Sequence, residues 1–456
     1  MLNRIWLGML LAAMAAAGVT GNVRAAVDAS IKGAETAVSL AFGLVGVMAL
    51  WLGIMRLAEC SGLVTHLARS LRPLLVRLFP GVPADHPAMG SMVLNIAANM
   101  LGLTNAATPL GLRAMRDLER LNPTPGTATN AMCTFLAINT GSVQLIPASA
   151  IAVLAAAGSV NPTAIVGSAL VATTFSSAAG LLAVKFLERL KAFRLTSPAS
   201  TALTSGQPSP RTGIAGGSDG EEHSDGAAAR GLTAGRPVTG GGWALLVAVM
   251  AGFVWLALVQ ANPQWIGRVA DPATAGQALW IRLLNSVSLL AIPFLLTAFP
   301  LYAALRGVAV YEEFVEGAKE GFQVAIRIIP FLVAMLVAIG FLRGAGAIEA
   351  FTDWLRGPLA AIGFPAELLP ISLIRPLSGS ASLAALGDLV KTFGPDSLLA
   401  RSGATIFGST ETTFYVIAVY FGSVGIRRTR HAVWAGLIAD ATGIVASVVV
   451  CRAMFG

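Results

Sequence analysis

The sequence predicts an all-α polytopic membrane protein with two related halves, broken or re-entrant helices and interfacial amphipathic helices. Of its 456 residues, 55% are hydrophobic and only 12% are charged, whereas about a quarter of the residues of a soluble domain are charged. Four runs are free of charge apart from Asp440 in the last: residues 36–55, 131–157, 162–184 and 431–450. Each is long enough to cross a bilayer, which needs roughly 20 residues of helix.

The net charge of +8 comes from basic residues beside the apolar runs, at 185–194 and 427–430, as the positive-inside rule expects. This position favours a membrane protein over a nucleic-acid-binding one. The three cysteines and four histidines are too scattered for a disulfide framework or a metal site. We therefore expect the lipid bilayer as a partner, and no nucleic acid, cofactor or dedicated metal site.

The first residues allow two interpretations. Residues 1–19 contain one arginine and an apolar stretch, and small residues follow. A signal peptide has the same features. We expect an uncleaved first span instead, because the apolar stretch is long and the segment after it is itself suited to a membrane.

The next elements occur twice along the chain. An apolar helix is expected at residues 37–57 and again at 322–342, with corresponding positions 284 residues apart. A glycine, Gly62 or Gly346, then opens a short amphipathic segment in each copy. In the first copy, residues 63–79 have apolar side chains at helical spacing with arginines among them, which is typical of a helix in the membrane interface.

Looser matches extend the repeat. They pair Leu110 with Leu386, Thr134 with Thr413, and Gly141 with Gly422. The alignment also places Arg375 where the first copy has Asn99. Duplicated halves with helix breakers in corresponding places are typical of transporters, although a duplication also serves purely structural ends.

Between the halves, residues 196–242 are rich in small and polar residues and contain no aromatic side chain. Such a segment cannot bury enough apolar surface to fold, so we expect a disordered linker. It separates a first membrane half, residues 1–195, from a second, residues 243–456. The basic cluster before the linker predicts that it lies in the cytoplasm.

Four segments place polar side chains or helix breakers at membrane depth. In the first, Asn95 and Asn99 share a helical face, and Gly102 and Pro109 are expected to interrupt the helix around Asn105. The other three are residues 130–144 with Asn139, residues 372–382 with Arg375, Ser378 and Ser380, and residues 409–413 with Thr410 and Glu411. Broken helices are tolerated in a bilayer where they are buried in protein or line a wet cavity, and their ends bind ions and solutes.

Two readings of these segments stay open. Asn, Ser and Thr also join helices by hydrogen bonds without a further role. Arg375 and Glu411 favour function more strongly, because an ionisable group in a membrane is costly and usually faces the interior, yet a buried pair between them would also suit a structural role. The candidate substrate-binding residues are Glu411, Arg375, Asn95, Asn99, Asn105, Asn139, Ser378, Ser380 and Thr410.

The two halves resemble two known families. The first is similar to spore maturation protein A through GLVGVMALWLGIMRLAE at 43–59 and NMLGLTNAATPLGLRAM at 99–115. The second is similar to spore maturation protein B through IRPLSGSAS at 374–382 and GSTETTFYVIAVYFGSVGIRRTRHA at 408–432. The chain looks like a fusion of both. It resembles proteins with the Gate, or nucleoside-recognition, domain, which are similar at domain level to concentrative nucleoside transporters and to the membrane part of ferrous-iron transporter B.

This resemblance implies a multi-pass protein of the bacterial inner membrane. Residues 408–411 are similar to a ligand-binding hairpin motif of nucleoside transporters, which favours a transporter-like protein for a small polar, nucleoside-like solute. Glu411 would contact the solute or a coupling cation, with Arg375 as an anion contact or charge partner. The alternative is a non-transporting factor for spore or envelope maturation. We expect no enzyme, because the sequence has no recognisable nucleophile–base set or nucleotide-binding loop, and a homo-oligomer stays an open option.

Overall fold

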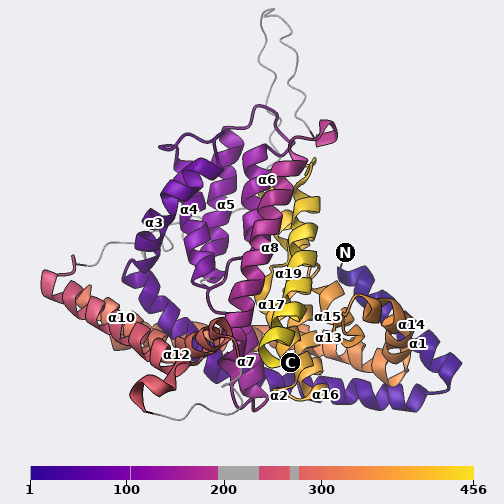
Figure 1. The fold of residues 1–456 in the computed structure, drawn as a ribbon. Helices are drawn as coiled ribbons and strands as arrows, with labels where there is room; N and C mark the ends of the chain where they lie inside the picture. The colour runs from indigo at the N-terminus through magenta and orange to yellow at the C-terminus, as the bar shows by residue number, and fades with distance from the viewer. Residues whose placement is uncertain (1, 103, 194–235, 268–276) are drawn as a thin grey trace, which may run out of the picture.

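The computed structural model describes residues 2–102, 104–193, 236–267 and 277–456, and among these it contains helices and no strand (Figure 1). Six of the described helices are long and apolar enough to cross a membrane. They are α2 (Val23–Cys60), α8 (Ile165–Leu187), α10 (Gly240–Ala261), α12 (Leu279–Leu305), α13 (Val310–Gly344) and α19 (Ala432–Phe455). The predicted class, an all-α polytopic membrane protein, is confirmed.

The two halves repeat one order of helices. After α2, the first half continues with α3 (Leu63–Leu78), α4 (Pro87–Met100), α5 (Thr104–Arg120), α6 (Asn130–Gly141), α7 (Ala148–Ala156) and α8. After α13, the second continues with α14 (Ala347–Ala361), α15 (Leu369–Ile374), α16 (Gly379–Phe393), α17 (Leu398–Ser409), α18 (Thr413–Ser423) and α19. The glycines that open α3 and α14, Gly62 and Gly346, have φ of 75° and 76°, a left-handed conformation that glycine adopts without steric cost.

Corresponding helices of the two halves pack antiparallel. A Cβ built on Gly317 of α13 would lie 2.5 Å from the carbonyl oxygen of Leu52, and one built on Gly344 would lie 2.5 Å from that of Ala25. The end of α13 thus meets the start of α2. In the other corresponding pair, α8 and α19, Gly180 faces Ala439 while Ser176 faces Gly443. The halves therefore have inverted topology, as in many secondary transporters.

Shorter helices lie beside these long ones. α3 and α14 occupy the two amphipathic segments that the repeat predicts, and the chain bends by 118° between Ala347–Ala361 and Ala366–Ile374. α1 (Leu2–Thr20) packs on α13, where Trp6 Nε1 donates to Ala334 O at 2.9 Å. The apolar part of α1, Trp6–Thr20, is shorter than the six candidate spans. Most of the expected linker lies outside the described residues, and α10 begins at Gly240.

Three details of the prediction were wrong. Residues 131–157 are not one span but two helices, α6 and α7, because the chain leaves the helix at Ser142, whose φ is 34°. Pro109 does not interrupt a helix but lies within α5, as its sixth residue, although proline lacks the N–H of a helical hydrogen bond. The match of Gly141 with Gly422, and of Thr134 with Thr413, joins non-equivalent helices: Gly141 ends α6, whose counterpart by order is α17, whereas Gly422 lies in α18.

Candidate functional site

The four predicted polar segments coincide with four breaks between helices, and the breaks are joined in pairs. In the first half, Leu145 N, between α6 and α7, donates to Met100 O at the end of α4 at 3.0 Å. In the second half, Phe414 N, at the start of α18, donates to Pro376 O between α15 and α16 at 3.0 Å. The same backbone bond thus occurs in both halves, and it supports the expected correspondence of Asn99 with Arg375.

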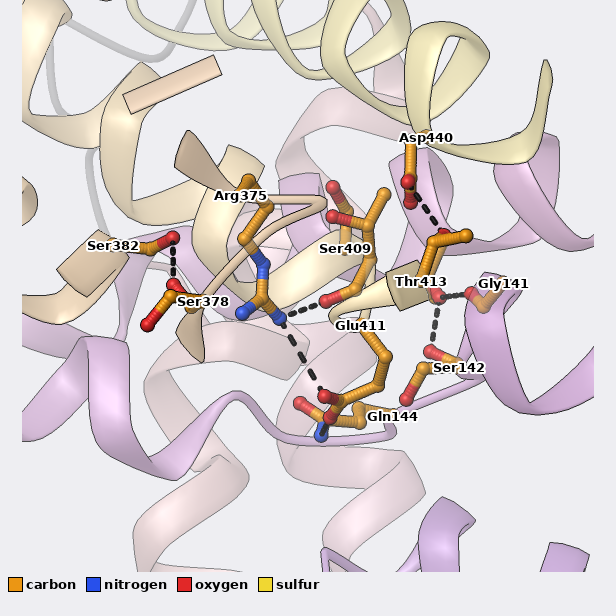
Figure 2. A network of polar contacts seen from close by, with 12 residues as sticks. Gly141, Ser142, Gln144, Arg375, Ser378, Ser382, Ser409, Glu411, Thr413 and Asp440 are labelled. Atoms are coloured by element: carbon orange, nitrogen blue, oxygen red, sulfur yellow. Dashed lines mark hydrogen bonds and ion pairs between the residues drawn. The ribbon is translucent and has the colours of Figure 1, made fainter. Parts of the chain in front are cut away.

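The breaks of the two halves meet at Glu411. Its backbone N donates to Thr140 O at 2.9 Å, and its Oε1 accepts from Gln144 Nε2 at 3.1 Å (Figure 2). The Glu411 side chain is 32% exposed, although its neighbours Thr410 and Thr412 are buried. The backbone of this break is therefore fixed by packing, while its carboxylate stays accessible.

Arg375 lies beside this carboxylate and is only 3% exposed. Its Nη2 donates to Thr410 O, the carbonyl at the C-terminal end of α17, and lies 3.9 Å from Glu411 Oε2 (Figure 2). Its guanidinium carbon lies 4.5 Å from the centre of the Phe407 ring. A cation suits this place because the C-terminal end of a helix carries partial negative charge. The structure thus pairs the two charged residues that the sequence singled out.

The candidate serines lie at the neighbouring break. Ser378 precedes α16, and its Oγ accepts from Ala381 N at 3.2 Å as a helix cap. Ser378 Oγ and Ser380 Oγ are 3.4 Å apart. A Cβ on Gly379, between them, would lie 3.3 Å from Thr412 Oγ1. The two serines therefore flank the point where the α15–α16 break contacts the α17–α18 break.

Three of the four candidate asparagines form an amide cluster. Asn99 Nδ2 donates to Asn139 Oδ1 at 2.8 Å and lies 3.5 Å from Asn95 Oδ1. Asn95, which is fully buried, donates to Ala107 O at 2.7 Å and to Tyr420 Oη at 3.2 Å. The fourth, Asn105, has its side chain outside the described part of the structure. Asn139 is next to Thr140, whose carbonyl oxygen accepts a hydrogen bond from Glu411 N. The amide cluster therefore adjoins Glu411 and Arg375 at the end of α6.

The structure adds four residues to the candidate set. Gln144 lies in a predicted polar segment, just after the break that Gly141 and Ser142 signal, but its contact with Glu411 could not be read from the sequence. Tyr420 lies within an apolar run that gives no sign of a site. Thr413 Oγ1 donates to Asp440 Oδ2 at 2.6 Å, and Asp440 is 1% exposed. Asp440 stands out in the sequence as a charge in an apolar run, but its position could equally be near the membrane surface.

The regions of this chain that match a known family contain all four breaks. The family described as Gate, nucleoside recognition, matches residues 41–186 and 325–427, together more than half of the chain. The chain belongs to the Gate family. Its two matched regions contain α4 to α7 and α15 to α18, so the Gate match includes every break described above and leaves α1, α10 and α12 outside.

Two known proteins are similar in sequence to parts of this chain. Spore maturation protein B of Bacillus subtilis (strain 168) is 46% identical over 176 residues, which are 39% of this chain and 99% of that protein. Spore maturation protein A of the same organism is 42% identical over 182 residues, 40% of this chain and 93% of that protein. This Gate-family chain is therefore homologous to both, as expected of a fusion.

Proposed function

We propose that this Gate-family protein is a transporter of the bacterial inner membrane that binds a small polar solute beside Glu411. The observation that supports this most is the meeting of helix breaks from two inverted halves at a partly exposed carboxylate. Inverted repeats with broken helices place solute and ion sites at such a point in secondary transporters. The proposal assigns binding, and no reaction, to these residues, and it places the linker in the cytoplasm.

The chemistry of the site favours a solute rich in hydroxyl or N–H groups. The Glu411 carboxylate accepts hydrogen bonds, and charge-assisted bonds of this kind are stronger than neutral ones. Arg375 Nε, which has no partner in the described structure, adds a donor. A nucleoside offers sugar hydroxyls to the Glu411 carboxylate and base acceptors to Arg375 Nε. The family's description as nucleoside recognition supports this class of solute.

The remaining candidates have different parts in the proposal. Asn99 is partly exposed, whereas Asn95 and Asn139 are buried and bonded to other protein groups. We assign solute contact to Asn99 and positioning to the other two. Thr410 and Ser378 hold the breaks by a backbone bond and a capping bond, and Ser380 Oγ lies beside Ser378 Oγ.

A second function is supported by a separate observation. The spore maturation proteins A and B are covered over 93% and 99% of their lengths, so this chain can also be a membrane factor in spore or envelope maturation that transports nothing. In that case the same polar groups would pack helices or bind a partner.

Purified full-length protein in detergent tests the proposal. Its thermal unfolding is measured with nucleosides, nucleobases and small carboxylates, and stabilising compounds are then tested for uptake in proteoliposomes. We expect a nucleoside-class solute to raise the unfolding temperature, and Glu411→Gln to weaken its binding by about tenfold or more, because a charged hydrogen bond contributes about 1.5–3 kcal/mol.

The matched control is Glu316→Gln, which removes a carboxylate from an exposed pair with Lys319 and should leave binding unchanged. The transport proposal fails, and the maturation factor is favoured, in either of two cases: no solute stabilises the protein, or Glu411→Gln folds normally and takes up the stabilising solute as well as the unchanged protein does.

A further inference from the structure

Asp440 lies beside the proposed solute site but takes no part in the contacts of Glu411, Gln144 and Arg375. It comes from the middle of α19 and is 1% exposed. Its Oδ2 accepts from Thr413 Oγ1 at 2.6 Å, whereas its Oδ1 has no hydrogen-bond partner. No lysine or arginine of the described chain forms an ion pair with it. A buried carboxylate in this state is costly, and such groups are normally paired or bound to a metal.

A second buried oxygen without a partner lies on α6, a helix that packs against α19. Thr140, in the last turn of α6, is fully buried, and its Oγ1 has no hydrogen-bond partner. On α19, a Cβ built on Gly436 would lie 3.4 Å from Thr140 Cγ2 and 3.2 Å from Thr413 Oγ1. Asp440 follows Gly436 by four residues and so shares its helical face. Figure 2 shows Thr413 between Asp440 and the Gly141–Ser142 end of α6.

The two halves differ in charge at the C-terminal ends of the corresponding helices α6 and α17. In the second half, Arg375 brings a positive charge to the C-terminal end of α17. Its counterpart in the first half is Asn99, so the C-terminal end of α6 keeps its partial negative charge. Thr413, the first residue of α18, donates to Asp440, and a helix N-terminus favours an ionised carboxylate. Arg375 acts electrostatically on both Glu411 and Asp440, so these three side chains together have one more negative charge than positive.

We propose that Asp440 Oδ1 and Thr140 Oγ1 are ligands of a monovalent metal cation of the size of Na⁺, held between α6, α18 and α19. Hard cations prefer carboxylate, hydroxyl and carbonyl oxygens, and the C-terminal ends of broken helices coordinate such ions in transporters. One positive charge balances the excess negative charge of Asp440, Glu411 and Arg375. That the ion couples to solute movement rests on the proposed transport function, whereas its binding does not.

The test uses purified full-length protein in detergent without any solute. Thermal unfolding is followed while NaCl replaces choline chloride at constant ionic strength, at several pH values. We expect a saturable rise in unfolding temperature with Na⁺ and none with choline. Asp440→Asn should abolish the rise, and Thr140→Val should raise the half-saturating Na⁺ concentration about fivefold, as expected for one lost neutral oxygen contact of about 1 kcal/mol.

Thr134→Val is the matched control. Thr134 is another fully buried threonine of α6 whose Oγ1 has no partner. It lies six residues before Thr140, which is about 9 Å along the helix, so its loss should leave the Na⁺ response intact. If Asp440→Asn does not fold, the proposal is tested by comparing the Na⁺ dependence of unfolding in Thr140→Val and Thr134→Val. Equal half-saturating Na⁺ concentrations in these two variants overturn the proposal.

Two other outcomes also overturn it. The first is an unfolding temperature that depends on pH but not on Na⁺, which would mean that Asp440 carries a proton. The second is an unchanged Na⁺ response in Asp440→Asn. Because no solute is present, a failure of the nucleoside screen leaves this result untouched, and the two proposals can fail separately.

Discussion

At the scale of single residues, Arg375 is held by three different partners. Its bond to Thr410 O joins a cation to the negative end of a helix, and its position over Phe407 adds cation–π attraction. The third partner, Glu411, is 3.9 Å away and 32% exposed, so this ion pair is weakened by solvent. Arg375 therefore fixes the α17–α18 break, while Glu411 stays available to a ligand.

This division of roles predicts unequal losses of stability. Arg375→Ala should lower the free energy of unfolding by about 3 kcal/mol, because Thr410 O loses its donor in a buried place and the cation–π contact is lost. Glu411→Gln leaves both contacts intact and should cost at most about 1 kcal/mol. Unfolding in detergent measures both variants side by side. Equal losses would show that the ion pair, rather than the carbonyl and the ring, holds the guanidinium.

At the scale of elements, glycines set the distance between α2 and α13. Cβ atoms on Gly317 and Gly321 would lie 2.5 Å from the carbonyl oxygens of Leu52 and Met48. Gly33 of α2 faces the Leu336 carbonyl in the same manner, and Gly33 and Gly317 are corresponding residues of the repeat. Small residues allow membrane helices to pack closely through their backbones, so this inverted pair depends on glycine on both sides.

Gly317→Ala should therefore destabilise the protein by about 2 kcal/mol, as overpacking of a close contact does. Gly252→Ala in α10 is the control, since a Cβ at Gly252 would have no atom within 4 Å. That change should be neutral or stabilise the helix by up to about 1 kcal/mol, because alanine is the better helix former. Denaturant or thermal unfolding in detergent compares the two. If Gly317→Ala is as stable as Gly252→Ala, the α2–α13 contact is looser than described.

At the scale of the whole molecule, the halves also touch away from the solute site. Asp396, between α16 and α17, accepts from Ser159 Oγ at 2.7 Å and from Val160 N at 3.0 Å. Ser159 and Val160 lie between α7 and α8 in the first half. Transporters built from inverted repeats work largely by rocking one repeat or bundle against the other. Under the transport function that we propose, this contact between the repeats is expected to open and close.

A disulfide across this contact should stop the cycle. In a variant with Ser159→Cys, Asp396→Cys and Cys60→Ser, oxidation should abolish most solute uptake, and reduction should restore it. The other two native cysteines, Cys133 and Cys451, are buried. Each single-cysteine variant, oxidised in the same manner, serves as the control. Full uptake by the oxidised, cross-linked protein would mean that this contact stays closed throughout transport.

The sequence by itself determined the membrane class, the two halves and four places where helices break, although the break expected at Pro109 does not occur. These depend on local features: uncharged runs of sufficient length, and glycine, proline and polar residues within them. It also indicated that Arg375 corresponds to Asn99, which the matching bonds of Pro376 and Met100 support. Short motifs were less reliable. The pairings of Thr134 with Thr413 and of Gly141 with Gly422 failed because matches of two or three letters recur by chance in apolar helices.

Only the tertiary structure decided which breaks meet and which polar groups are left without a partner. Gln144 reaches Glu411 across 267 residues of chain, and Asn95 reaches Tyr420 across 325. Such contacts depend on the faces that distant helices present to each other, which local composition does not specify. An asparagine or threonine looks the same in a sequence whether its hydrogen bonds are satisfied or not. The unpaired oxygens of Asp440 and Thr140 became visible only once α6 and α19 were packed together.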